Sequence, residues 1–205
     1  MKPEKNERIL SAACQLFAES DFHNVSMEDV AVSAGVGKGT LYNYFQSKDD
    51  LYFSILQSRL EKLLDVLEKA YSNRDDFIRN LRSLILHLYL FMSKYRYFHQ
   101  IWNREENSLK QKNNTVILEL RNKILDLIRR VLFQGQNEKL LKKNVNIDIS
   151  VQLIYCMINY LSINNHTVDK KEMRIDSLME ILLNGIGIKE IDTSVHYKEY
   201  KHDSR

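Results

Sequence analysis

The chain has 205 residues, of which 44% are hydrophobic and 28% charged, as expected for a folded protein of one or two domains. It contains one proline and six glycines, so little interrupts helices and an all-α fold is favoured. The formal net charge is +3, but residues 1–50 carry five basic and eight acidic side chains, so bulk charge is no evidence for a nucleic-acid partner.

The hydropathy pattern argues against two kinds of targeting segment. No apolar run approaches the roughly 18 residues of a membrane span, since even Leu81 to Met92 is broken by polar side chains. The first residues, Met1 to Glu7, are polar and lack the core of a signal peptide. We therefore expect a cytoplasmic protein.

The first predicted helix runs from Glu7 to Glu19, with an apolar face of Ile9, Ala12, Ala13, Leu16 and Phe17. Cys14 lies in this helix and Cys156 in a later one, without metal-type spacing between them. Both cysteines are expected to be reduced and buried, and no metal site is predicted.

The segment from Ser26 to Leu51 predicts two short helices around a glycine turn, followed by the start of a third. Ser26 and Asp29 approximate a capping box at the start of the first short helix. Its apolar stripe consists of Met27, Val30, Ala31 and Ala34. Gly35 suits the left-handed conformation of a helix end, and Gly37 is an acceptable cap for the next helix.

The second short helix, Lys38 to Phe45, must be held by packing because it is too short to be stable alone. Leu41 and Phe45 are four residues apart and can face the core together. The other sides present Thr40, Tyr42, Asn43 and Tyr44. Hydroxyls, an amide and a lysine suit contacts with phosphates and base edges, and such a helix can lie in the DNA major groove.

The segment A-G-V-G-K-G-T-L-Y-N-Y-F-Q-S-K-D-D-L resembles the signature of TetR/AcrR-family transcriptional regulators. The match covers about 50 residues at the N-terminus, and Gly37 stands where the family often has serine. The resemblance implies a three-helix helix-turn-helix DNA-binding domain in residues 1–50. A larger helical domain for ligand binding and dimerisation would occupy 51–187, and a polar tail 188–205.

The resemblance also implies which residues contact DNA: Ser26, Lys38, Gly39, Thr40, Tyr42, Asn43, Tyr44 and Lys48. Ser26, Tyr44 and Lys48 would hold phosphates, and the others would approach base edges or the sugar-phosphate backbone. In the alternative interpretation, Ser26 is only a cap, Tyr44 only packs, and Lys48 is a solvated charge.

Downstream, amphipathic spacing predicts helices over 48–71, 75–95, 116–133, 147–163 and 171–186, and a short aromatic helix around Phe98, Ile101 and Trp102. Residues 103–114 are polar and are expected to form a loop. The helices 147–163 and 171–186 are apolar on most sides, so a two-fold four-helix interface between two chains is expected. The alternative is that the monomer covers both helices.

The resemblance further implies a small-molecule effector among the middle helices. The candidate lining residues are His87, Phe91, Tyr95, Phe98, Trp102, Tyr155 and Asn159. The alternative is that each is an ordinary core residue. A hydrophobic effector is expected, with an anionic group such as an acyl thioester. Residues 51–187 carry 21 basic and 15 acidic side chains, which is consistent with an anionic group; the alternative is that these charges form an ordinary solvated surface.

The expected function is therefore a transcriptional repressor that binds a palindromic operator as a homodimer and is released by its effector. The alternative is a ligand-independent DNA-coating or division-control protein on the same fold. No phosphate-binding loop, G-x-S-x-G or H-E-x-x-H motif is present, so neither an enzyme nor a cofactor is expected.

Overall fold

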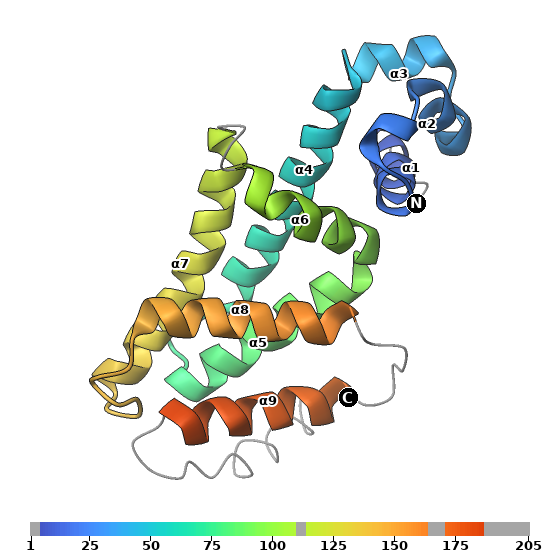
Figure 1. Ribbon diagram of the computed structural model, residues 1–205. Helices are drawn as coiled ribbons and strands as arrows, with labels where there is room; N and C mark the ends of the chain where they lie inside the picture. Colours follow the sequence, from blue (N-terminus) through green and yellow to red (C-terminus); the bar gives the residue numbers. More distant parts are fainter. Residues whose placement is uncertain (1–4, 110–113, 164–170, 187–205) are drawn as a thin grey trace. The chain divides into compact units, whose positions relative to one another are not determined.

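The computed structural model describes residues 5–109, 114–163 and 171–186, and within these ranges all regular elements are helical (Figure 1). In chain order they are α1 (Lys5–Glu19), the 3-10 turn η1 (Phe22–Asn24), α2 (Met27–Ala34), α3 (Lys38–Tyr44), α4 (Lys48–Ala70), α5 (Phe77–Lys94), α6 (Arg96–Leu109), α7 (Thr115–Asn137), α8 (Ile147–Ile163) and α9 (Lys171–Ile186). The predicted all-α fold is confirmed.

The chain divides into two compact units. Unit 1 comprises Met1–Leu64 and Lys94–Asn122, and unit 2 comprises Asp65–Ser93 and Lys123–Arg205. The helices α4 and α7 each contribute residues to both units. The domain limits expected from the sequence, 1–50 and 51–187, stay a prediction.

In unit 1, α1 packs against α2 and α6, and α2 packs against α3. The first helix buries the apolar face that its spacing predicts, with Ile9, Ala13 and Phe17 fully covered. The guanidinium of Arg59, itself buried, lies 2.7 Å from the Glu7 carboxylate and joins α4 to α1. Arg104 of α6 donates to the carbonyl oxygens of Phe17 and Ala18 at the end of α1.

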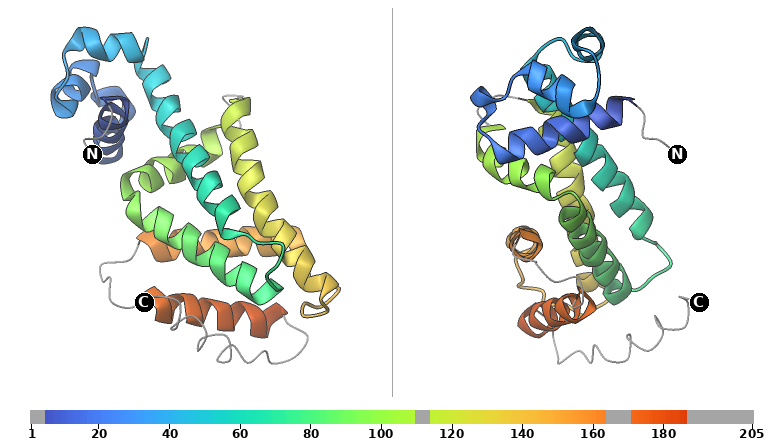
Figure 2. Two further views of the ribbon diagram at one scale, coloured as in Figure 1. Left: turned by 180° about the vertical axis from the view of Figure 1, so that it is seen from behind. Right: turned by 90° about the vertical axis from the view of Figure 1, so that its right-hand side faces the viewer.

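In unit 2, a buried amide joins α5 to α7. The Asn80 side chain is fully buried and bonds to Ser72, to the carbonyl oxygen of Asp75 and to the Gln134 side chain. Arg82 of α5 forms an ion pair with Asp176 of α9. Two views of the molecule show that α8 and α9 run side by side (Figure 2).

Two sequence predictions about helix boundaries were wrong. Residues 103–109 belong to α6 rather than to a loop. The helix α7 passes through Gly135 and ends at Asn137, four residues beyond the predicted limit of 133. A Cβ at position 135 would lie 2.8 Å from the Phe77 ring, so this glycine allows α7 and α5 to approach closely. The predicted tail, 188–205, lies outside the described residues.

The two cysteines differ in burial. Cys14 is buried as predicted, and burial raises the pKa of its thiol to about 12. Cys156 is exposed, so the prediction that it is buried was wrong. Within residues 5–109, 114–163 and 171–186, no helix is long and apolar enough to cross a membrane.

Candidate functional site

The helix-turn-helix segment is built by local capping. The Ser26 hydroxyl oxygen accepts from the Asp29 backbone N–H at 3.1 Å, and an Asp29 carboxylate oxygen accepts from the Ser26 backbone N–H at 3.0 Å. These contacts confirm the capping box, and the bonds from the Ser26 hydroxyl and N–H lower the pKa of Asp29. Gly35 ends α2 with φ +63°, in the left-handed region that favours glycine.

The helix α3 is buried on one side and exposed on the other. Leu41 is fully buried and Phe45, which follows the helix, is nearly so, as their spacing predicts. Lys38, Gly39, Tyr42, Asn43 and Tyr44 are exposed, and Thr40 is half-buried. The structure therefore gathers six of the eight predicted DNA-contact residues on one short helix. Gly37 caps this helix without a side-chain hydrogen bond.

One ion pair joins α3 to α2. Lys38 pairs with Glu28, and both side chains are exposed. The hydrogen bond from Lys38, together with its charge, lowers the pKa of Glu28, and the same contact raises the pKa of Lys38. The lysine that was expected to approach DNA therefore already has an acidic partner in the free protein. The sequence interpretation missed Glu28, although its position in the first turn of α2 was readable.

The other two predicted DNA-contact residues have partners within the protein. The Ser26 hydroxyl donates to the Asp29 carboxylate at 2.6 Å. The Lys48 ammonium lies 2.8 Å from the Phe22 carbonyl oxygen and 3.0 Å from that of Val25. Each residue therefore has a structural role whether or not it also touches DNA.

The residues expected to line an effector pocket divide between the units. Tyr95, Phe98 and Trp102 belong to unit 1, where Phe98 and Trp102 are fully buried with ring centroids 6.2 Å apart. The Arg59 guanidinium lies 4.8 Å from the Tyr95 ring centroid. A single pocket lined by all seven residues stays a prediction.

The other four candidates, His87, Phe91, Tyr155 and Asn159, belong to unit 2. His87 Nδ1 lies 2.8 Å from the Ser83 carbonyl oxygen, so that ring nitrogen has a partner within α5. The Asn159 amide oxygen is buried without a hydrogen-bond partner in the described chain. A buried acceptor of this kind is uncommon in folded proteins.

Two polar groups on α5 were missed by the sequence interpretation. The hydroxyls of Tyr89 and Ser93 are buried and also lack a hydrogen-bond partner in the described chain. Their spacing of four residues places them on one side of α5. This spacing was readable from the sequence and was the signal that could have identified them.

The aliphatic side chains of α4, α5, α7 and α8 leave little space at one place in unit 2. A gap of about 10 Å³, room for no more than about one water, lies among the aliphatic side chains of Leu67, Leu81, Leu84, Ile85, Leu88, Ile128, Ile154 and Ile158. Binding of a large molecule here would require these helices to separate.

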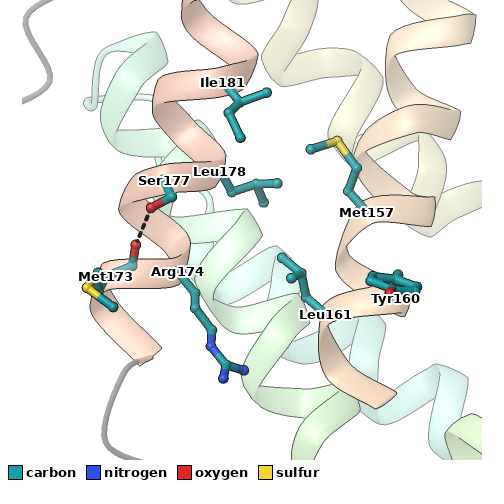
Figure 3. Close-up of a pocket in the computed structure, with 8 residues that line it drawn as sticks. All are labelled: Met157, Tyr160, Leu161, Met173, Arg174, Ser177, Leu178 and Ile181. Carbon is teal, nitrogen blue, oxygen red and sulfur yellow. Dashed lines mark hydrogen bonds between the residues drawn. The ribbon is translucent and has the colours of Figure 1, made fainter. Parts of the chain in front are cut away.

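The outer face of α8 and α9 is apolar and exposed in the single chain. Its large exposed side chains are Ile149, Leu153, Tyr160, Met173 and Ile181. A groove of about 270 Å³ lies between the two helices, and the Met157 and Leu161 side chains point across it toward Leu178 and Ile181 (Figure 3). These exposures disagree with the alternative that the monomer covers both helices.

A capped pair of short helices with an exposed polar second helix defines a helix-turn-helix DNA-binding protein. Residues 9–55 match the family model described as bacterial regulatory proteins, tetR family, and residues 75–163 match a tetracyclin repressor-like C-terminal domain. The chain belongs to the TetR family and is a DNA-binding transcription regulator rather than an enzyme.

Relatives of known name agree with this assignment. The chain is 25% identical over 199 residues to a fatty acid metabolism regulator protein of Bacillus subtilis strain 168, covering 92% of this chain and 98% of the relative. It is 31% identical over 84 residues to the transcriptional activator FasR of Mycolicibacterium smegmatis, covering 41% of this chain but only 38% of that relative.

The solved structure of FadR from Bacillus subtilis in complex with stearoyl-CoA matches with a TM-score of 0.72. Its sequence identity is 22%, and the match covers 88% of this chain and 98% of that one. At this identity the likeness shows the fold alone.

Proposed function

We propose that this cytoplasmic protein is a repressor that binds a palindromic operator as a homodimer and leaves it when a hydrophobic effector binds. The observation that carries the DNA-binding part is the exposed polar surface of α3, which is held in place by the burial of Leu41. In a dimer, the α3 helix of each chain would read one half of the operator.

The proposed DNA contacts divide by chemistry. Asn43 and Thr40 can bond with base edges, and Gly39 allows the backbone of α3 to approach closely. Tyr42 and Tyr44, both about half exposed, can contact sugar-phosphate. Lys38 would exchange its Glu28 partner for a phosphate. Ser26 would contribute its position at the start of α2, where helix N-termini favour phosphate.

The proposed dimer uses the outer face of α8 and α9. Ile149, Leu153 and Tyr160 are spaced by four and seven residues and form one stripe on α8, each more than half exposed. A contiguous exposed apolar face of this kind marks an interaction site. A second copy fits because a two-fold interface places the same stripe and groove on both chains.

The proposed effector is hydrophobic, with an anionic group such as an acyl thioester. Two observations support this class: the excess of basic residues in 51–187, and the likeness to the Bacillus subtilis fatty acid metabolism regulator protein. The related FadR structure contains stearoyl-CoA. The effector would bind among the middle helices and shift the spacing of the two reading helices through α4. This requires that it bind the released form more tightly than the DNA-bound form.

Genome-wide footprinting of the purified protein on its own organism's DNA, at stated salt, tests this proposal. We expect a few sharp palindromic sites, and we expect long-chain acyl thioesters to release the protein from them. Many weak and dispersed sites, insensitive to such compounds, would instead indicate a DNA-coating protein. Increased transcription of the adjacent genes on binding would make the protein an activator.

A further inference from the structure

The ammonium of Lys48 is enclosed by the backbone of the α1–α2 connection. Its nitrogen lies 2.8 Å from the Phe22 carbonyl oxygen, 3.3 Å from that of His23 and 3.0 Å from that of Val25. A lysine ammonium has three N–H donors, so these carbonyls account for all of them. The nitrogen also lies 4.5 Å from the centroid of the Phe22 ring, within cation–π range. A DNA phosphate would have to displace at least one of these contacts.

The start of α4 fixes where this side chain emerges. The Ser47 hydroxyl oxygen accepts from the Asp50 N–H at 3.0 Å, and the Asp50 carboxylate accepts from the Gln46 N–H at 2.8 Å. A cation at a helix N-terminus is disfavoured by the helix dipole, so Lys48 needs local acceptors there. The three carbonyl oxygens supply them.

The segment that Lys48 holds leads directly into α2. The carbonyls of Phe22 and His23 belong to η1, and a helix of this length leaves its carbonyls without internal partners. The Phe22 ring is held by Phe17 and Tyr52, with centroids 5.5 Å and 5.1 Å away. Val25 immediately precedes Ser26, whose capping box begins α2. Lys48 therefore joins α4 to the entry of α2 across more than 20 residues of chain.

We propose that Lys48 is a positioning residue, whose ammonium holds residues 22–25 and thereby the start of α2 in the geometry that DNA binding requires, and that it binds no phosphate itself. This inference rests on the proposed DNA-binding function, but the carbonyl contacts exist in the free protein and can be tested without DNA.

Lys48→Met separates positioning from phosphate binding. We expect amide hydrogen exchange of residues 22–29 in the free variant to accelerate about tenfold, and DNA affinity to fall about tenfold at every salt concentration, because the segment must be ordered again on binding. The slope of log affinity against log salt should be unchanged on a duplex carrying one footprinted site. A slope lower by about 0.9 per phosphate contact, about 1.8 for a dimer, overturns the proposal, as does unchanged exchange.

Two further variants keep the test decisive. Lys48→Arg keeps the charge but presents a planar fork, so it should restore the affinity and exchange rate only in part. Full restoration of affinity without restored exchange protection overturns the proposal. Lys48→Arg also carries the test if circular dichroism finds Lys48→Met unfolded. Lys38→Met is the matched control and should lower the salt slope without changing exchange at 22–29. If the wild type binds no DNA, the proposed function fails. The comparison of hydrogen exchange still tests whether the Lys48 ammonium holds residues 22–25.

Discussion

The helix-turn-helix segment and the α8–α9 pair leave different chemistry exposed. Above its buried Leu41, α3 presents a lysine, an amide and two tyrosine hydroxyls, whereas α8 and α9 present aliphatic side chains such as Leu153, 54% exposed, and Ile181, 63% exposed. The first surface is stable in water without a partner, because its polar groups stay hydrated. The second is unfavourable in water, so covering it with another surface lowers the free energy. This difference agrees with the two proposed tasks, reversible DNA recognition by α3 and lasting association of two chains through α8 and α9.

Leu153→Asp should have the largest effect, because a two-fold interface buries the new carboxylate twice. We expect the dimer dissociation constant to rise more than about a hundredfold, measured by analytical ultracentrifugation, and operator affinity to fall with it. Helix content should not change, since the side chain is already half exposed in the single chain. Val116→Asp, a similarly exposed position on α7, is the control and should remain dimeric.

Labelling of the cysteines measures the same equilibrium between monomer and dimer. Cys156 is exposed and lies on the stripe of Leu153, three residues away, whereas Cys14 is buried and its raised pKa keeps the thiol unreactive. We expect maleimide to label one thiol in the Leu153→Asp monomer and to label the wild-type dimer slowly. Rapid labelling of Cys156 in a wild-type dimer would place the interface elsewhere.

Asn43→Ala tests the polar surface and should have the next largest effect. An asparagine that bonds bidentately to adenine contributes about 1–3 kcal/mol of discrimination, so operator affinity should fall tenfold or more while non-specific binding is retained. Oligomeric state and thermal stability should be unchanged, because the side chain is exposed. Gln57→Ala on α4 is the matched amide control. Equal loss on specific and random duplexes would mean that Asn43 contacts the backbone and reads no base.

The helix-turn-helix was predictable because each of its boundaries is encoded locally. Ser26 and Asp29 begin α2, Gly35 ends it, and Leu41 identifies the buried side of α3. The limits of α8 and α9 were also predicted correctly, because apolar residues at helical spacing, bounded by polar segments, identify a helix.

The features that were not predicted depend on contacts distant in sequence. Gly135 stops no helix because its missing side chain makes room for the Phe77 ring. Residues 103–109 continue α6, in which Arg104 donates to the carbonyl oxygens of Phe17 and Ala18 at the end of α1. Lys48 bonds to carbonyls 23–26 residues away, a relationship without any sequence signal.

Glu7→Gln should change the pH dependence of stability. Burial raises the pKa of Glu7, but Arg59 and Lys62 outweigh it and hold the pKa below its ordinary value of 4.5. A carboxyl with a lowered folded-state pKa stabilises the fold above that ordinary value, and this contribution is lost as pH falls through the folded-state pKa.

We expect Glu7→Gln to lower the free energy of unfolding by about 1–2 kcal/mol at pH 7, less than for a fully buried pair because the carboxylate is 34% exposed. The difference from wild type should shrink below about pH 4.5, measured by urea unfolding. Glu61→Gln, an exposed control, should behave as wild type. A pH-independent difference would assign the effect to packing rather than charge.

Glu28→Gln should have the smallest effect, and its sign is informative. In the free protein Glu28 neutralises Lys38, so DNA must compete with a carboxylate for that lysine. Removing the acid should raise operator affinity about two- to fivefold at low salt and less at high salt, because the pair is exposed and therefore screened. Asp65→Asn makes the same charge change in unit 2 and should have a smaller effect. If Glu28→Gln instead weakened DNA binding, the ion pair would be needed to orient α3. The polar surface of α3 would then depend on contacts within the protein, just as the apolar face of α8 and α9 depends on a partner.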